Sequence, residues 1–186
     1  MDIAQFAPQL LWGGIGAIVA TGLFAIIVVL VGGFNEFTVR ALASTFVLGY
    51  YCLTMVATFG QGPTFLVLST MGAMIAGFGL LLTLPVIWAR KFDMGEATFK
   101  IVFSLAVVAF GLALGCINFR MAGTSPLGVS VMMGAVATVA VVTLMMLSII
   151  TNGLRTTGEG FMRVLIALAI LMVMLSILNP VIGKMA

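Results

Sequence analysis

Residues 41 to 89 form an uninterrupted stretch of 49 residues without a charged side chain. A transmembrane helix needs about 20 apolar residues to cross a hydrocarbon core of ~30 Å. The stretch is therefore too long for one crossing and long enough for two. Gly60, Gly62 and Pro63 lie near its middle, and such a cluster favours a turn. The stretch therefore predicts two apolar helices joined by a turn.

The rest of the chain has the same character. Of its 186 residues, 63% are hydrophobic and 7% are charged, whereas soluble domains carry roughly 25% charged residues. In lipid, only helices and closed β-barrels satisfy the backbone N–H and C=O groups. The apolar runs lack the alternation of polar and apolar residues that barrel strands show, so helices are expected. We therefore expect one domain over residues 1–186, an all-α integral membrane protein with six transmembrane helices. The expected helices cover about residues 9–33, 38–59, 64–88, 97–119, 126–151 and 160–178, and Asn179-Pro180 ends the last of them.

Three short segments hold much of the charge, and each has a Glu followed four residues later by a Lys or Arg. The pairs are Glu36 and Arg40, Glu96 and Lys100, and Glu159 and Arg163. In a helix this order is the favourable one, worth about 0.3–0.5 kcal/mol per pair. We interpret the segments as charged turns where helices begin at the membrane surface. The alternative is a ring of ion pairs that links neighbouring hairpins on the cytoplasmic side.

An internal repeat has an offset of 63 residues. It relates Glu96 to Glu159 and Pro63 to Pro126. The repeat predicts three helical hairpins, about 8–59, 63–120 and 126–182, arranged around an axis along the membrane normal, as in some transporters. Chance is the alternative, because Pro favours helix starts and Glu suits a first turn.

The distribution of basic residues predicts the topology. Six crossings place six basic residues on one side and two on the other: Arg40, Arg90, Lys91, Lys100, Arg155 and Arg163 against Arg120 and Lys184. Short cytoplasmic loops carry an excess of Lys and Arg. We therefore expect cytoplasmic charged turns and both termini on the non-cytoplasmic side of a plasma membrane of bacterial type.

The residues that most membrane chemistry requires are missing from the expected crossings. The chain has no His, which removes the commonest metal ligand and general base. No Asp, Glu, Lys or Arg lies deep inside an expected crossing, as proton pumps and ion-coupled carriers normally require. Methionine pairs such as Met132 and Met133 can hold Cu(I) but more often fill gaps in a core. We expect no catalytic residue, no cofactor, no metal site and no nucleic-acid partner.

Two groups of residues are candidates for a site or for helix packing. Ser44, Tyr51, Thr54 and Thr58 are spaced by seven, three and four residues, which places them on one helix face. Such a polar stripe joins helices or lines a small pocket for a lipid, a quinone or a neutral solute. Gly111 and Gly115 form a GxxxG pattern, which suggests close helix packing.

These features favour a non-catalytic protein. Our first hypothesis is a structural or accessory subunit of a larger membrane complex, with lipids and other membrane subunits as partners. The second is a small channel or carrier for a neutral or weakly polar solute, built as an oligomer or a pseudo-threefold bundle. A membrane enzyme is the least favoured class.

Overall fold

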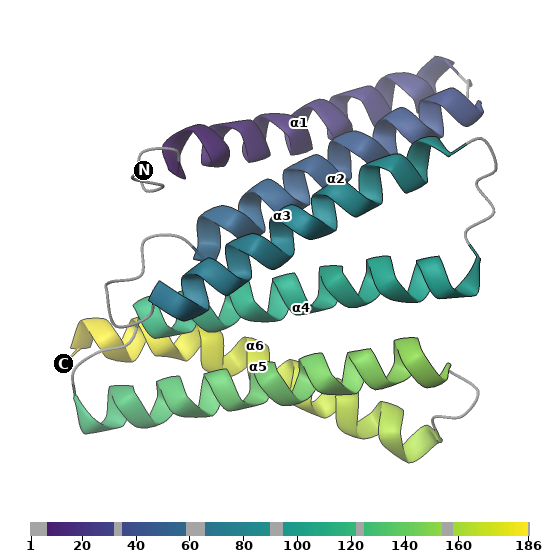
Figure 1. The fold of residues 1–186 in the computed structure, drawn as a ribbon. Helices are drawn as coiled ribbons and strands as arrows, with labels where there is room; N and C mark the ends of the chain where they lie inside the picture. The colour runs from purple at the N-terminus through teal and green to yellow at the C-terminus, as the bar shows by residue number, and fades with distance from the viewer. Residues whose placement is uncertain are drawn as a thin grey trace. The chain divides into compact units, whose positions relative to one another are not determined.

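In a computed structural model, the residues that the structure describes form six α-helices. The structure describes residues 7–31, 35–58, 66–89, 95–121, 125–153 and 158–185, and has no strand among them. The helices are α1 (Ala7–Val31), α2 (Glu36–Thr58), α3 (Leu66–Trp88), α4 (Glu96–Arg120), α5 (Pro126–Asn152) and α6 (Glu159–Met185) (Figure 1). The predicted turn at residues 60–63 and the basic residues Arg90, Lys91 and Arg155 lie outside the described residues.

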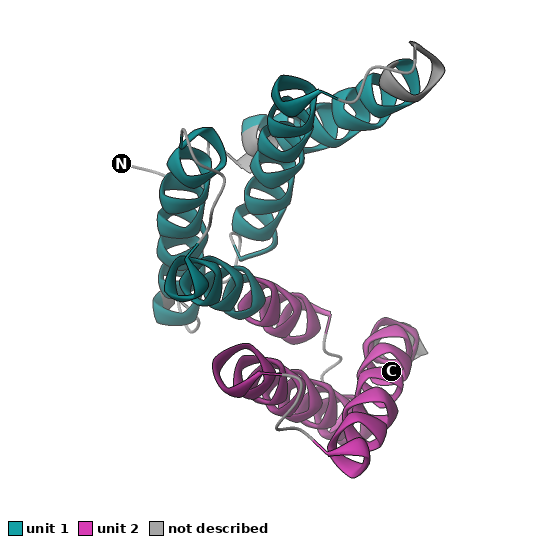
Figure 2. Ribbon diagram, turned by 90° about the vertical axis from the view of Figure 1, so that its right-hand side faces the viewer, with its two compact units in different colours: residues 1–109 teal, residues 110–186 magenta. Residues whose placement is uncertain are grey.

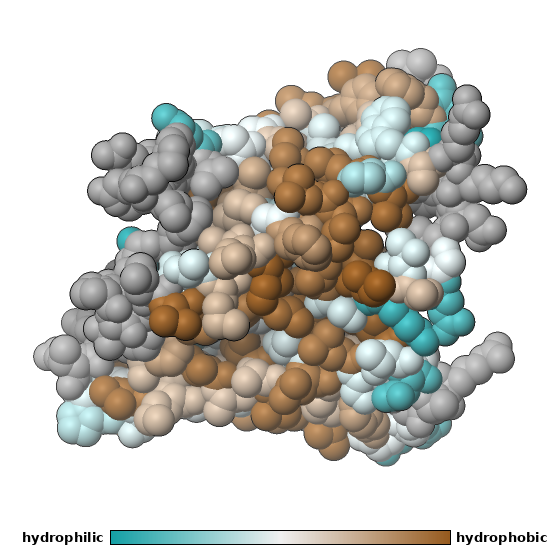
Figure 3. All heavy atoms as spheres, in the orientation of Figure 1, coloured by the Kyte–Doolittle hydropathy of each residue, from teal (hydrophilic) through white to brown (hydrophobic). Residues whose placement is uncertain are grey.

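Five of these helices are long and apolar enough to cross a membrane, namely α2 to α6. The sixth helix, α1, has 25 residues, and Trp12–Ile27 is the apolar part of it whose side chains the structure describes. Large apolar side chains face outward on every helix, and Val67, Leu81 and Ile166 are each more than half exposed. Figure 3 shows hydrophobic residues in brown over much of one face, with hydrophilic residues in teal mainly toward its edges. The chain is therefore an all-α membrane protein.

The first residues of α2 and α5 are set by side chains that cap the helix start. The Asn35 side chain accepts a hydrogen bond from the Thr38 backbone N–H at 2.8 Å, so α2 begins at Glu36, two residues before the expected position. Ser125 caps α5 in the same way by accepting from the Gly128 N–H at 3.1 Å. Both caps satisfy backbone donors that the first helical turn leaves without a partner.

The predicted end of the last helix is wrong. Asn179 and Pro180 do not end α6, which continues to Met185. Pro180 has no N–H and so deprives only the Ser176 carbonyl of its helical donor. Helices in lipid tolerate such a residue when neighbouring groups satisfy the freed backbone. Asn179, next to the proline, is fully buried and bonded to α4, which secures this turn of α6.

The contacts divide the chain into two compact units, and the division lies inside α4 (Figure 2). Unit 1 covers residues 1–109, and unit 2 covers residues 110–186. In unit 1, α2 packs against both α1 and α3; in unit 2, α5 packs against α6. Each pair runs antiparallel (Figure 1).

Small residues set the distance between α1 and α2. A Cβ placed on Gly49 would lie 2.6 Å from the Ile18 side chain and 3.1 Å from the Gly14 carbonyl oxygen. Helices in lipid associate through such close backbone contact, because hydrocarbon offers no hydrophobic driving force between them.

Candidate functional site

A line of polar contacts joins α2 to α3 in unit 1. Trp88 donates its indole N–H to the Ser44 hydroxyl at 2.9 Å, and Ser69 donates its hydroxyl to the Thr58 carbonyl at 2.6 Å. Between these two contacts the Tyr51 ring lies against Gly79. We call this set the α2–α3 polar seam. It runs along the whole of the antiparallel pair.

The four residues of the predicted polar stripe lie on this side of α2. Tyr51, Thr54 and Thr58 are buried, and Ser44 is half-buried. The Thr54 hydroxyl donates to the Tyr51 carbonyl at 2.9 Å, and the Thr58 hydroxyl donates to the Met55 carbonyl at 2.8 Å. Most of the hydroxyl groups of the stripe therefore already form hydrogen bonds, either within α2 or in the α2–α3 polar seam.

Tyr51 differs from the rest of the stripe because its hydroxyl is not satisfied. The side chain is 1% exposed, and its hydroxyl comes near Thr83 without a hydrogen bond of acceptable geometry. Thr83 donates instead to the Gly79 carbonyl at 2.6 Å. A Cβ on Gly79 would lie 2.6–2.7 Å from the Tyr51 ring and hydroxyl, so only glycine leaves room for the ring here.

Tyr50, which no sequence pattern marked as a candidate, has the kind of hydrogen-bond partner that Tyr51 lacks. Its hydroxyl donates to the Ala106 carbonyl of α4 at 2.6 Å. The two tyrosine rings meet edge to face, with centroids 5.1 Å apart. The adjacent tyrosines therefore serve different neighbours, since one packs against α3 and the other binds α4.

This difference predicts opposite results for two matched variants. Tyr50→Phe should lose about 0.5–1.5 kcal/mol of unfolding free energy, because it removes a hydrogen bond to a carbonyl. Tyr51→Phe should cost nothing or stabilise slightly, because a buried hydroxyl without a partner is unfavourable. Thermal unfolding in detergent, followed with a thiol-reactive dye that reports exposure of Cys52 and Cys116, would measure both. Equal losses in the two variants would contradict this assignment.

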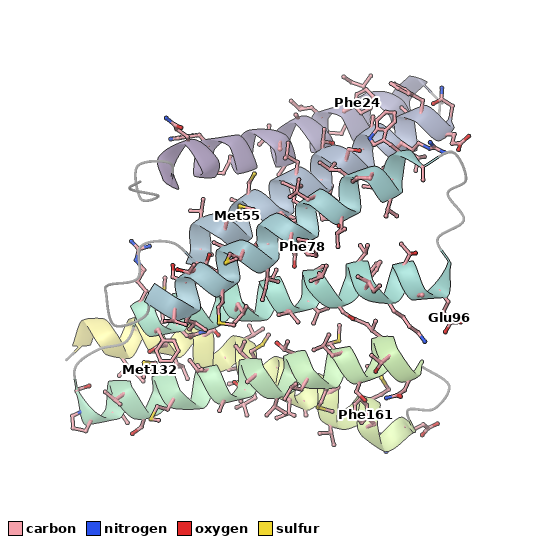
Figure 4. All side chains as sticks on the ribbon, viewed as in Figure 1. Phe24, Met55, Phe78, Glu96, Met132 and Phe161 are labelled. Carbon is pink, nitrogen blue, oxygen red and sulfur yellow. The ribbon has the colours of Figure 1, made fainter. Side chains whose placement is uncertain are left out.

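Each predicted charged pair lies within one helix. Lys100 Nζ is 2.7 Å from Glu96 Oε1 at the start of α4, where Figure 4 labels Glu96. Arg163 Nη2 is 3.5 Å from Glu159 Oε2 at the start of α6, and Arg40 pairs with Glu36. Exposed pairs of this kind contribute little to stability.

Arg40 also contacts the next helix. It donates to the Trp88 carbonyl at the end of α3 at 3.4 Å, where a positive charge is favourable because the last carbonyls of a helix carry partial negative charge. Its side chain is 13% exposed, against 81% for Arg163. Arg40 is therefore a partly buried side chain of α2 that also bonds to the end of α3.

The two glycines of the GxxxG pattern have different surroundings in unit 2. A Cβ on Gly111 would lie 2.3 Å from the Thr143 hydroxyl oxygen of α5. A Cβ on Gly115 would meet no atom within 4 Å, leaving aside its own helix backbone. Gly111 is thus in tight contact with α5, and Gly115 is not.

A buried amide cluster in unit 2 joins α4 to α6. Asn179 donates to the Asn118 carbonyl at 2.7 Å and to the Asn118 side-chain oxygen at 3.3 Å. Asn118 in turn donates to the Ser176 hydroxyl at 3.1 Å and to the Leu114 carbonyl at 3.0 Å. Asn118 and Asn179 are 1% and 0% exposed. The carbonyl of Asn118 is one of the last four of α4, which have no donor in their own helix, so Asn179 acts as its cap.

The amide cluster was not predicted from the sequence. The two asparagines are 61 residues apart, and nothing local relates them. Their one distinguishing mark is that each is an amide close to the end of an apolar run, where a buried amide needs a partner.

The described residues contain no group of three or more His, Cys, Asp or Glu side chains that could hold a metal ion. Apart from the contact of Arg40 with Trp88, the hydrogen bonds between described helices are made by hydroxyls, amides, an indole N–H and backbone carbonyls. Comparison of the chain with protein-family models, with curated proteins and with solved structures gives no match.

Proposed function

We propose that this chain is a non-catalytic subunit of a larger membrane complex, to which it contributes helices and lipid contacts. The observation that supports this most directly is the outward side of α1. A Cβ placed on Gly13 or Gly16, which lie about 60° apart around the helix, meets no atom within 4 Å. Small residues on an outward helix face allow the backbone of another helix to approach closely. A partner subunit would supply that helix.

The polar groups within the helices agree with this role. The contacts of the α2–α3 polar seam and of the amide cluster link helices of the same chain. The ion pairs at the starts of α2, α4 and α6 each lie within one helix. A subunit that supports a complex needs no more than this. The predicted topology, with the charged turns cytoplasmic and both termini outside in a bacterial-type plasma membrane, belongs to the same proposal.

Purification from the native membrane in a mild detergent tests the proposal. We expect co-migration with a large complex on native gels. The double variant Gly13→Leu/Gly16→Leu should release the chain from that complex without lowering its own melting temperature, because a Cβ at either position has open space around it. Ala167→Leu, on the exposed side of α6, is the control. A wild-type chain that runs alone, or an association unaffected by the double variant, would contradict the proposal.

The alternative is a small channel or carrier for a neutral or weakly polar solute. The buried, unsatisfied Tyr51 hydroxyl favours it, since a solute could supply the missing partner. A symmetric oligomer that conducts a solute after reconstitution, with flux lost in Tyr51→Phe and kept in Tyr50→Phe, would support this alternative over the subunit.

A further inference from the structure

Two aromatic rings remain exposed where α2 begins and α3 ends. Phe37 and Trp88 meet edge to face with ring centroids 5.8 Å apart, and they are 65% and 47% exposed. Trp88 donates its indole N–H to the Ser44 hydroxyl at 2.9 Å, so its ring is held in one orientation. We call Phe37 and Trp88 the aromatic pair. Because each helix supplies one ring, the start of α2 and the end of α3 lie at the same level.

The surface on either side of the aromatic pair changes from charged to apolar. Glu36 directly precedes Phe37, and its side chain is 73% exposed. In the other direction, the large exposed side chains of α3 are all apolar: Val67, Met71, Met74, Phe78 and Leu81. Tryptophan is enriched at such a boundary in membrane proteins, because its ring is mostly apolar but carries a polar N–H.

Trp12 marks a second level, on α1, where its side chain is 73% exposed. Gly14 lies against α2, since a Cβ placed on it would be 3.1 Å from the Cys52 Cβ. The two helices run antiparallel (Figure 1), so two residues earlier in α1 corresponds to two residues later in α2. Trp12 therefore lies near the level of Thr54, which is 17 residues after Phe37. At about 1.5 Å per residue, the two levels are roughly 26 Å apart along α2.

This separation is close to the thickness of a bilayer hydrocarbon core, about 30 Å. No charged residue lies between the levels in α1 or α3, and in α2 the last one is Arg40, one turn from Phe37. We propose that the aromatic pair and Trp12 bind the headgroup regions of opposite leaflets and thereby set the depth of unit 1 in the bilayer. The partner at both surfaces is the lipid interface, and the proposal is independent of the subunit role.

Depth-dependent fluorescence quenching tests the proposal, because Trp12 and Trp88 are the two tryptophans of the chain. Trp12→Phe leaves one of them as the only emitter, and Trp88→Phe leaves the other. Each purified full-length variant is reconstituted alone in phosphatidylcholine vesicles that carry a nitroxide either at the headgroup or at the end of an acyl chain. In both variants the headgroup nitroxide should quench more strongly, at a depth of roughly 13 Å from the bilayer centre, half the separation of the levels.

Two further variants in a Trp12→Phe/Trp88→Phe background are the matched controls. Phe78, which Figure 4 labels, is 58% exposed and lies ten residues before Trp88, about 15 Å nearer the bilayer centre along α3. Phe78→Trp should therefore be quenched more strongly by the chain-end nitroxide, whereas Phe37→Trp should give the same depth as Trp88. Gel filtration shows that each variant is monodisperse before reconstitution.

Three results would overturn the proposal. The first is headgroup quenching of Trp12 or Trp88 that is no stronger than chain-end quenching. The second is the absence of quenching by either nitroxide, which would mean that protein rather than lipid covers the ring. The third is a depth for Phe37→Trp that matches Phe78→Trp instead of Trp88.

Discussion

Gly111→Ala should destabilise unit 2, whereas Gly115→Ala, four residues later in the same helix, should not. The new Cβ at position 111 would lie 2.3 Å from the Thr143 hydroxyl oxygen, so α4 and α5 would have to move apart or Thr143 would have to change its rotamer. Overpacking of this kind costs about 1–3 kcal/mol, which corresponds to roughly 2–12 °C in melting temperature for a chain of this size. Thermal unfolding in detergent would measure the shift.

The same contact supplies the decisive control. Thr143→Ala removes the hydroxyl and the methyl group that the new Cβ would meet, and leaves only the Thr143 Cβ at 3.2 Å. In the Gly111→Ala background it should therefore restore most of the lost stability, which appears as a favourable coupling energy in a double-mutant cycle. Gly115→Ala should leave the melting temperature unchanged or raise it slightly, since alanine favours helix. Equal losses at positions 111 and 115, or no rescue by Thr143→Ala, would contradict the contact.

Asn179→Leu should have an effect of similar size. The substitution removes two hydrogen bonds to Asn118 and leaves the Asn118 carbonyl and side-chain oxygen buried without this donor. Leaving a buried polar group unsatisfied costs about 1–3 kcal/mol, and hydrogen bonds between helices in lipid contribute about 0.6 kcal/mol on average. We therefore expect a loss of about 1–3 kcal/mol in unfolding free energy, measured by reversible denaturation in mixed micelles.

Asn152 is the matched control for this prediction. It is also an asparagine near a helix end, but it is exposed and donates to the Ser148 hydroxyl of its own helix at 3.3 Å. Asn152→Leu should change the unfolding free energy by less than about 0.5 kcal/mol. Similar losses in Asn152→Leu and Asn179→Leu would show that the amide cluster contributes no special stability.

What the sequence by itself determined was the class of the fold and the course of its helices. Long uncharged runs admit no solvent but lipid, and in lipid a chain of this pattern can satisfy its backbone only as helices. Local features followed from spacing alone. The pairs Glu96–Lys100 and Glu159–Arg163 need nothing beyond one helical turn to meet, and Ser125 and Pro126 are sufficient to begin α5.

Only the tertiary structure decided which helices meet and through which atoms. It placed Gly111 rather than Gly115 against Thr143, and it brought Asn118 to Asn179. It also gave Tyr50, rather than Tyr51, the hydrogen-bond partner. It carried α6 past Pro180, where local rules predicted an end. The physical reason is that lipid is as apolar as the protein interior. The hydrophobic pattern that distinguishes inside from outside in a soluble protein therefore carries little information about which face of a membrane helix is buried.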